Sequence, residues 1–135
     1  MKLIINTDGG ARGNPGPAGL GVAIRDEDEK MIKEFGEFLG NQTNNFAEYS
    51  ALIRALEESK NLGATHLEVR MDSELIVKQM NGQYKIKEPT LQILAARVIK
   101  LRNQFESVTF THVRREFNKD ADRMVNEAID SHVLR

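Results

Sequence analysis

The pattern of apolar and polar positions predicts three consecutive strands in the first part of the chain. Residues 2–7, 19–25 and 31–39 are rich in β-branched and apolar side chains, and turn-forming or charged residues separate them. The first strand is expected to end at Asp8, because two glycines follow it, and residues 11–18 are expected to form a loop. The three strands are therefore expected to pair as an antiparallel meander.

Helical and strand-like periods alternate along the rest of the chain. From Phe46, apolar residues recur at helical spacing until Asn61-Leu62-Gly63 signals the end of a helix. Residues 67–72 alternate between apolar and polar side chains, which predicts a half-buried strand, and Ser73 can cap a short helix that ends near Met80. The remaining expected elements are a helix at 91–105, a strand at 108–113 and a final helix at 118–132.

This order of elements predicts an α/β fold with a five-stranded mixed sheet flanked by helices. Helical connections after the third and fourth strands require right-handed crossovers. The most economical sheet then places strands 1, 4 and 5 side by side in parallel, while strands 1 to 3 are antiparallel. A chain of 135 residues has the size of one compact domain, so residues 1–135 are expected to form a single domain.

The composition limits the cellular compartments and the types of binding site that fit this chain. The chain has no cysteine, which excludes disulfides and thiolate metal sites within it and favours an intracellular protein. No apolar run is long enough to span a membrane, and the first expected strand begins at Lys2, so a soluble, cytoplasmic protein is expected. The net charge of −1 implies that a nucleic acid would have to be bound locally.

Two of the expected strands end on an aspartate, Asp8 and Asp72. Each residue alone has a structural explanation, Asp8-Gly9 as a hairpin turn and Asp72-Ser73 as a helix cap. Ligand sites in open α/β sheets lie beyond the carboxyl ends of parallel strands. The two aspartates together therefore indicate a site at this end of the sheet.

Two further carboxylates lie beside the apolar faces of their helices. Glu48 precedes Leu52 by four positions, and Asp122 shares a face with Val125 and Ile129. Both side chains are therefore expected to point towards the sheet. The alternative for Glu48 is a first-turn glutamate that only complements the helix dipole.

Four gathered carboxylates without matching cations would repel one another, so they imply bound divalent ions. Oxygen ligands in the absence of cysteine favour Mg²⁺, with Mn²⁺ as a possible substitute. A pair of such ions about 4 Å apart can activate water and stabilise the leaving oxygen in a phosphoryl displacement. The expected chemistry is phosphodiester hydrolysis.

Five short motifs occur in order along the chain: Thr7-Asp8-Gly9-Gly10, Gly13-Asn14-Pro15-Gly16-Pro17, Asn44-Asn45-Phe46-Ala47-Glu48, Asp72-Ser73 and Ala121-Asp122-Arg123-Met124-Val125-Asn126. Together they resemble the type 1 ribonuclease H family over essentially the whole chain. The resemblance implies a ribonuclease H-like fold. It also implies a two-metal-ion endonuclease that cuts the RNA strand of RNA-DNA hybrids and leaves 5'-phosphate and 3'-hydroxyl ends.

The resemblance also implies roles for particular residues. The family's metal-binding and catalytic acids correspond to Asp8, Glu48, Asp72 and Asp122, and the residue at the Glu48 position also contacts a ribose 2'-hydroxyl beside the cut. No obligate protein partner is expected, and the chain is expected to be a monomer.

The same resemblance assigns minor-groove contacts to Gly9, Asn14 and Asn44. The alternative is plain turn chemistry, because Asn and Gly are usual turn residues.

The chain departs from many relatives in two places. Relatives often carry a basic, aromatic protrusion between the middle helices, but residues 82–89 offer only Tyr84, Lys85 and Lys87, which predicts a weaker grip on the substrate. Relatives also often place a mobile histidine in the loop before the last helix, where this chain has Arg115.

Arg115 is the expected substitute for that loop histidine. Its permanent charge can hold the leaving phosphate but cannot shuttle a proton, and a solvated surface arginine is the alternative. His112 is expected to lie within a strand, and His112, His66 and His132 are all expected to be structural.

Two other functions are compatible with the same sequence features. A non-catalytic hybrid-binding module would fit the same fold, but the loss of one acid would mark it, and all four are present. A metal-dependent exonuclease or phosphatase would use the same ions, but it would leave a circular or end-blocked hybrid intact.

Overall fold

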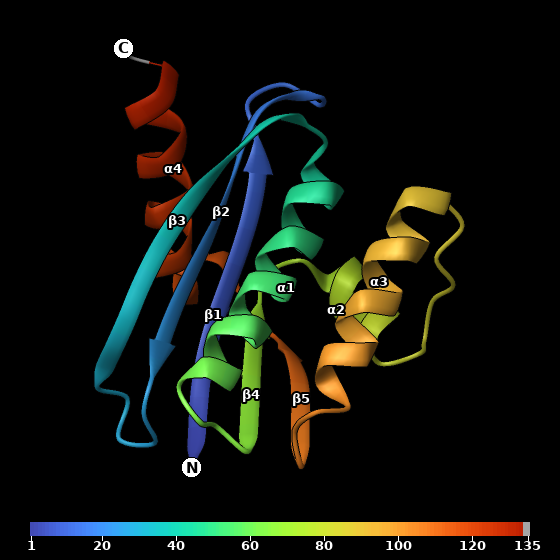
Figure 1. The fold of residues 1–135 in the computed structure, drawn as a ribbon. Coiled ribbons are helices and arrows are strands. Elements are labelled where there is room, and N and C mark those ends of the chain that lie inside the picture. The colour runs from blue at the N-terminus through green and yellow to red at the C-terminus, as the bar shows by residue number, and fades with distance from the viewer. Residues whose placement is uncertain (134–135) are drawn as a thin grey trace.

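Helices cover both faces of a five-stranded mixed sheet in the computed structural model, which describes residues 1–133 (Figure 1). The strands are β1 (Lys2–Ala11), β2 (Gly16–Arg25), β3 (Met31–Gln42), β4 (His66–Met71) and β5 (Ser107–His112). The helices are α1 (Asn44–Asn61), α2 (Glu74–Met80), α3 (Pro89–Arg102), the short 3-10 helix η1 (Arg115–Phe117) and α4 (Lys119–Val133). Within this part of the chain, no helix has both the length and the hydropathy that a membrane crossing requires.

The sheet has the strand order β3-β2-β1-β4-β5. β1, β2 and β3 pair as an antiparallel meander, and β1, β4 and β5 pair in parallel. The predicted fold class and the predicted parallel neighbours are therefore confirmed.

The prediction that the first strand ends at Asp8 is wrong. β1 loses its parallel partner after the pair Thr7 and Met71, but it keeps β2 as a partner as far as Ala11 and Ala18. The glycines that follow Asp8 are held in this antiparallel ladder, and the expected loop at 11–18 shrinks to residues 12–15. Other boundaries move by two or three residues, since α1 begins at Asn44 and α3 runs from Pro89 to Arg102.

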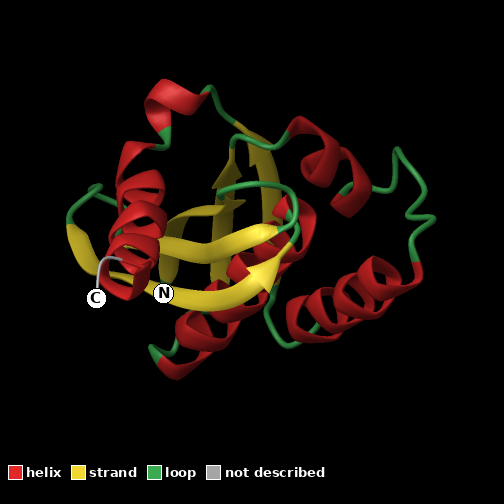
Figure 2. Cartoon of the chain, turned by 90° about the horizontal axis from the view of Figure 1, so that it is seen from above, coloured by secondary structure: helices red, strands yellow, loops and turns green. Residues whose placement is uncertain are grey.

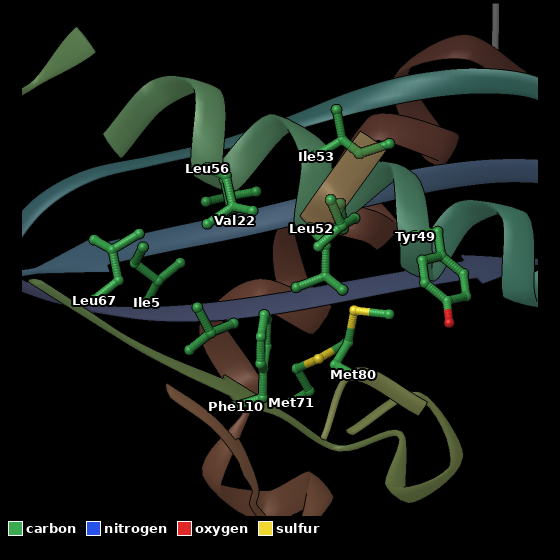
Figure 3. Packing of buried hydrophobic residues seen from close by; sticks show 14 of the residues in the cluster. Ile5, Val22, Tyr49, Leu52, Ile53, Leu56, Leu67, Met71, Met80 and Phe110 are labelled. Atoms are coloured by element: carbon green, nitrogen blue, oxygen red, sulfur yellow. The ribbon is translucent and has the colours of Figure 1, made fainter. Parts of the chain in front are cut away.

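The larger hydrophobic core lies between the sheet and α1, with α2 and α3 closing its side (Figure 3). Alternate residues of each strand face it, as the period of two requires. The fully or almost fully buried side chains include Ile5, Val22, Tyr49, Leu52, Leu56, Val69 and Met71.

Helix α4 packs on the opposite face, and the strands lie between α4 and the helices α1 and α3 when the molecule is seen from above (Figure 2). Glycines permit this close approach. A Cβ atom on Gly21 would lie 2.0 Å from the carbonyl oxygen of Ala121, and one on Gly36 would lie 2.3 Å from that of Met124. Any side chain at these positions would therefore push α4 away from the sheet.

Candidate active site

Asp8 and Asp72 meet at the edge where β1 and β4 stop pairing. The last parallel pair is Thr7 with Met71, so the two aspartates follow it at the same level. Asp8 lies inside a continuing strand, so the hairpin-turn explanation for it is wrong. The predicted cap of the short helix is confirmed for Ser73, whose hydroxyl accepts from the backbone N–H of Ile76 at 3.4 Å, so capping does not account for the Asp72 carboxylate.

Glu48 reaches the same place because Gly9 has no side chain. A Cβ atom on Gly9 would lie 2.2 Å from the carbonyl carbon of Ala47, so α1 can rest directly on β1 only at a glycine. The N–H of Gly9 donates to the Glu48 carboxylate at 2.5 Å and to the Asp8 carboxylate at 3.0 Å. Because α1 begins at Asn44, Glu48 lies beyond the first turn, and the dipole explanation for it is wrong.

Carboxylate oxygens of Asp8, Glu48 and Asp72 all lie within 4.8 Å of one another. Two adjoining surface hollows with a shared lining surround them, here together named the carboxylate hollow. Its central lining comes from Asp8, Gly9, Asn44, Asp72 and Arg115, with Arg12, Asp122 and Asn126 on the α4 side and Glu48 and Ser73 on the α1 side. The structure thus brings all four predicted acids to one hollow.

Asp122 lies in the first turn of α4, which can pack closely on the sheet because Gly21 has no side chain. Gly21 is the partner of Asp8 in the antiparallel ladder between β1 and β2. The close approach of Ala121 to Gly21 therefore brings the adjacent residue, Asp122, beside Asp8.

Asn118 connects this turn of α4 to β1, a role that no motif or periodic pattern in the sequence indicates. Its side chain is 1% exposed, donates to the carbonyl oxygen of Thr7 at 2.9 Å and accepts from the amide of Asn6 at 2.9 Å. Its own carbonyl oxygen accepts from the backbone N–H of Asp122 at 3.1 Å. The one available sequence signal was Asn6, a polar residue inside the apolar run of the first strand.

Burial and mutual repulsion disfavour the charged forms of Asp8 and Glu48. The pKa of Asp8 is raised well above its usual range, first by burial, then by the charges of Glu48 and Asp72, and to a smaller extent by hydrogen bonds to Glu48 and Asp122. Burial also raises the pKa of Glu48, although hydrogen bonds from Asp8 and Gly9 oppose this. A donor set of carboxylate oxygens, in which the buried pair Asp8 and Glu48 resists ionisation in the absence of a cation, fits divalent ions such as Mg²⁺.

Arg115 lies in η1 and lines the carboxylate hollow, as the sequence suggested. Its neighbour Arg114 pairs with Glu116 at 3.6 Å, whereas Arg115 forms no ion pair within residues 1–133. The three histidines do not line the hollow. His112 lies within β5, as predicted, and its side chain is exposed.

The other two histidines make structural contacts. His66 lies 3.4 Å from the Glu106 carboxylate, and the ring of His132 stacks on Phe38 with the ring centroids 3.9 Å apart.

The side chains of Asn14 and Asn44 stabilise the turn between β1 and β2. The side-chain oxygen of Asn14 accepts from the N–H of Asn44 at 3.0 Å, and that of Asn44 accepts from the N–H of Ala11 at 2.8 Å. These bonds fasten the turn between β1 and β2 to the start of α1. Asn44 lines the carboxylate hollow, whereas Asn14 lines a neighbouring hollow with Thr43 and Phe46.

Comparison with known proteins places this site in a family. The profile of the family described as Reverse transcriptase-like matches residues 6–128. A ribonuclease H of Nitrosomonas eutropha is 33% identical over 154 aligned positions, which cover 97% of this chain and 92% of that protein. A bifunctional protein of Mycobacterium tuberculosis is 43% identical over 97% of this chain, but the chain spans only 36% of that protein's length.

A solved structure gives the same result. A ribonuclease H1 isolated from compost, solved in complex with an RNA/DNA hybrid, is 51% identical and superposes with a TM-score of 0.93, covering 97% of this chain and 99% of the other. The resemblance drawn from the sequence motifs is thereby confirmed, and the chain belongs to the type 1 ribonuclease H family.

Proposed function

We propose that the chain is a metal-dependent endonuclease, a single ribonuclease H domain that hydrolyses the RNA strand of RNA-DNA hybrids. The observation that carries the proposal is the convergence of Asp8, Glu48 and Asp72 within 4.8 Å, with Asp122 on the same hollow. The hybrid-bound ribonuclease H1 from compost, 51% identical to this chain, supports the choice of substrate.

The four acids are proposed to hold two Mg²⁺ ions, for which Mn²⁺ could substitute. When bound, such a pair supplies an activated water and stabilises the leaving oxygen, which would yield 5'-phosphate and 3'-hydroxyl ends. The chain's own part is to keep the acids in place. The N–H of Gly9 fixes the Glu48 carboxylate. Asn118 bonds to β1 and so holds the first turn of α4, which places Asp122 beside Asp8.

Recognition of the hybrid is proposed to rest on groups around the same hollow. Glu48 would contact a ribose 2'-hydroxyl next to the cut, since this group distinguishes RNA from DNA. Gly9, Asn14 and Asn44 would approach the minor groove. In the free protein the Gly9 N–H and the side-chain oxygens of both asparagines are already bonded internally, which leaves the asparagine amide N–H groups for the substrate.

One cleavage assay tests the proposal. Labelled RNA-DNA hybrid, RNA-RNA and DNA-DNA duplexes, together with a circular hybrid, are incubated with the protein and Mg²⁺. We expect cuts within the RNA strand of both the linear and the circular hybrid. Binding without cleavage would instead identify a hybrid-binding module, and a circular substrate that stays intact would identify an exonuclease.

Arg115 offers a test of the loop chemistry. Arg115→Ala is expected to lower kcat on the hybrid by roughly tenfold to a hundredfold, because a cation that faces the developing phosphate charge would be lost. Arg114→Ala is the matched control, since that side chain is 79% exposed and pairs with Glu116. Steady-state kinetics on both variants test this prediction. An unchanged kcat for Arg115→Ala would show that Arg115 is a solvated surface arginine without a role in cleavage.

A further inference from the structure

Arg12 is the second cation that lines the carboxylate hollow. Among residues 1–133, Arg12 and Arg115 are the only basic residues in its lining. Arg115 comes from η1, and Arg12 comes from the turn between β1 and β2, so the two approach the acids from different elements. The Arg12 side chain is 42% exposed, which leaves part of it open to a ligand.

Two residues one turn apart on α4 hold the Arg12 guanidinium in place. It donates to the side-chain oxygen of Asn126 at 3.2 Å and pairs with Asp130 at 2.6 Å. Asn126 in turn donates to the carbonyl oxygen of Asp122 at 3.1 Å. Arg12 is therefore oriented along the same helix that presents one of the four acids.

The ion pair between Arg12 and Asp130 is weak enough for a ligand to replace Asp130. Asp130 is 48% exposed, and ion pairs in such positions contribute little to folding because water screens them. A guanidinium has five N–H donors in a planar fork that matches phosphate, and the two contacts to α4 leave donors free. A phosphate could bind beside Asp130 or take its place without loss of the fold.

A polyanion that approaches four clustered carboxylates needs compensating charge nearby. We propose that Arg12 binds a backbone phosphate of the strand that lies in the carboxylate hollow, adjacent to the phosphate that is cut, and that Asp130 occupies this cation in the free protein. The assignment rests on the proposed hydrolysis of hybrids and adds a specific substrate contact to it.

Three variants test this contact in steady-state cleavage of a labelled hybrid with Mg²⁺. Arg12→Ala is expected to raise KM by about tenfold, the effect of losing one charged hydrogen bond, with little change in kcat. The dependence of log kcat/KM on log salt concentration should flatten by close to one unit. Arg97→Ala removes an exposed arginine of α3 that pairs with Glu57 of α1 and does not line the carboxylate hollow, so it is the control and should leave KM and the slope unchanged.

Asp130→Asn separates binding from a structural role. If Arg12 holds phosphate, removal of its competing carboxylate leaves KM unchanged or lower. If Arg12 acts only by fastening the turn to α4, Asp130→Asn removes the ion pair from that link and raises KM in the same direction as Arg12→Ala, and the proposal is overturned. The proposal is also overturned if the wild type is active and Arg12→Ala has the same KM. If the wild type cuts no hybrid, both the proposed function and the proposed phosphate contact of Arg12 fail.

Discussion

Replacement of Asp72 by asparagine is expected to abolish cleavage of the hybrid, with kcat reduced by about a thousandfold or more, the scale that follows removal of a catalytic side chain. The amide keeps the shape of the carboxylate but loses the charge that holds a divalent ion. Asp28→Asn is a suitable control, because Asp28 is exposed in the turn between β2 and β3, near the start of β1 and away from the four acids. A fully active Asp72→Asn protein would remove the basis of the proposed site.

The same variant is expected to fold at least as well as the wild type without metal. Asp72 is one of the charges that raise the pKa of Asp8 and of Glu48, so its neutralisation relieves repulsion within the cluster. Thermal melting in EDTA should give an equal or higher melting temperature for Asp72→Asn. A marked destabilisation would indicate that the Asp72 carboxylate has a structural role.

The contribution of Asp8 and Glu48 to the stability of the metal-free protein is expected to fall as the pH rises above about 4, the ordinary pKa of these acids. Folding raises the pKa of Asp8 and Glu48, so the folded state holds protons that the unfolded state has already released. Their stabilising contribution is complete below the unfolded pKa and is lost as the pH passes the raised values. Denaturant melts in EDTA across this range should show a smaller loss for Asp72→Asn than for the wild type.

Gly21→Ala is expected to destabilise the protein strongly. The new Cβ atom would lie 2.0 Å from the carbonyl oxygen of Ala121, which is backbone and cannot rotate away. Overpacking of this kind costs about 3 kcal/mol or more, equivalent to a fall in melting temperature of roughly 10 °C for a chain of this size. Because Asp122 follows Ala121 directly, the displacement should also lower kcat at temperatures where the variant remains folded.

Gly10→Ala is the matched control for this substitution. Gly10 lies in β1 and faces the same helix, but a Cβ atom there would meet only the Val125 side chain, at the ordinary contact distance of 3.9 Å. Its melting temperature should change little. If the two variants melt alike, α4 does not depend on the bare backbone at Gly21, and the explanation for the position of Asp122 fails.

The order of elements and the parallel neighbours could be predicted because they depend on local periodicity and on the handedness of crossovers. Alternation in residues 67–72 was sufficient to place Asp72 at the end of a strand, and helical spacing was sufficient to turn Glu48 and Asp122 towards the sheet. The motifs then added the family, which the comparisons confirm.

Only the tertiary structure decided how far β1 runs and what holds the acids together. A strand continues for as long as a neighbour pairs with it. The sequence predicted that β2 pairs with β1, but it did not reveal that this pairing carries β1 past Asp8 as far as Ala11. Asn118 meets Thr7 across 111 positions of sequence, and Arg12 meets Asn126 across 114. Hydrogen bonds and ion pairs depend on distances of a few ångströms, and side chains so far apart in sequence reach those distances only after the sheet and α4 have packed.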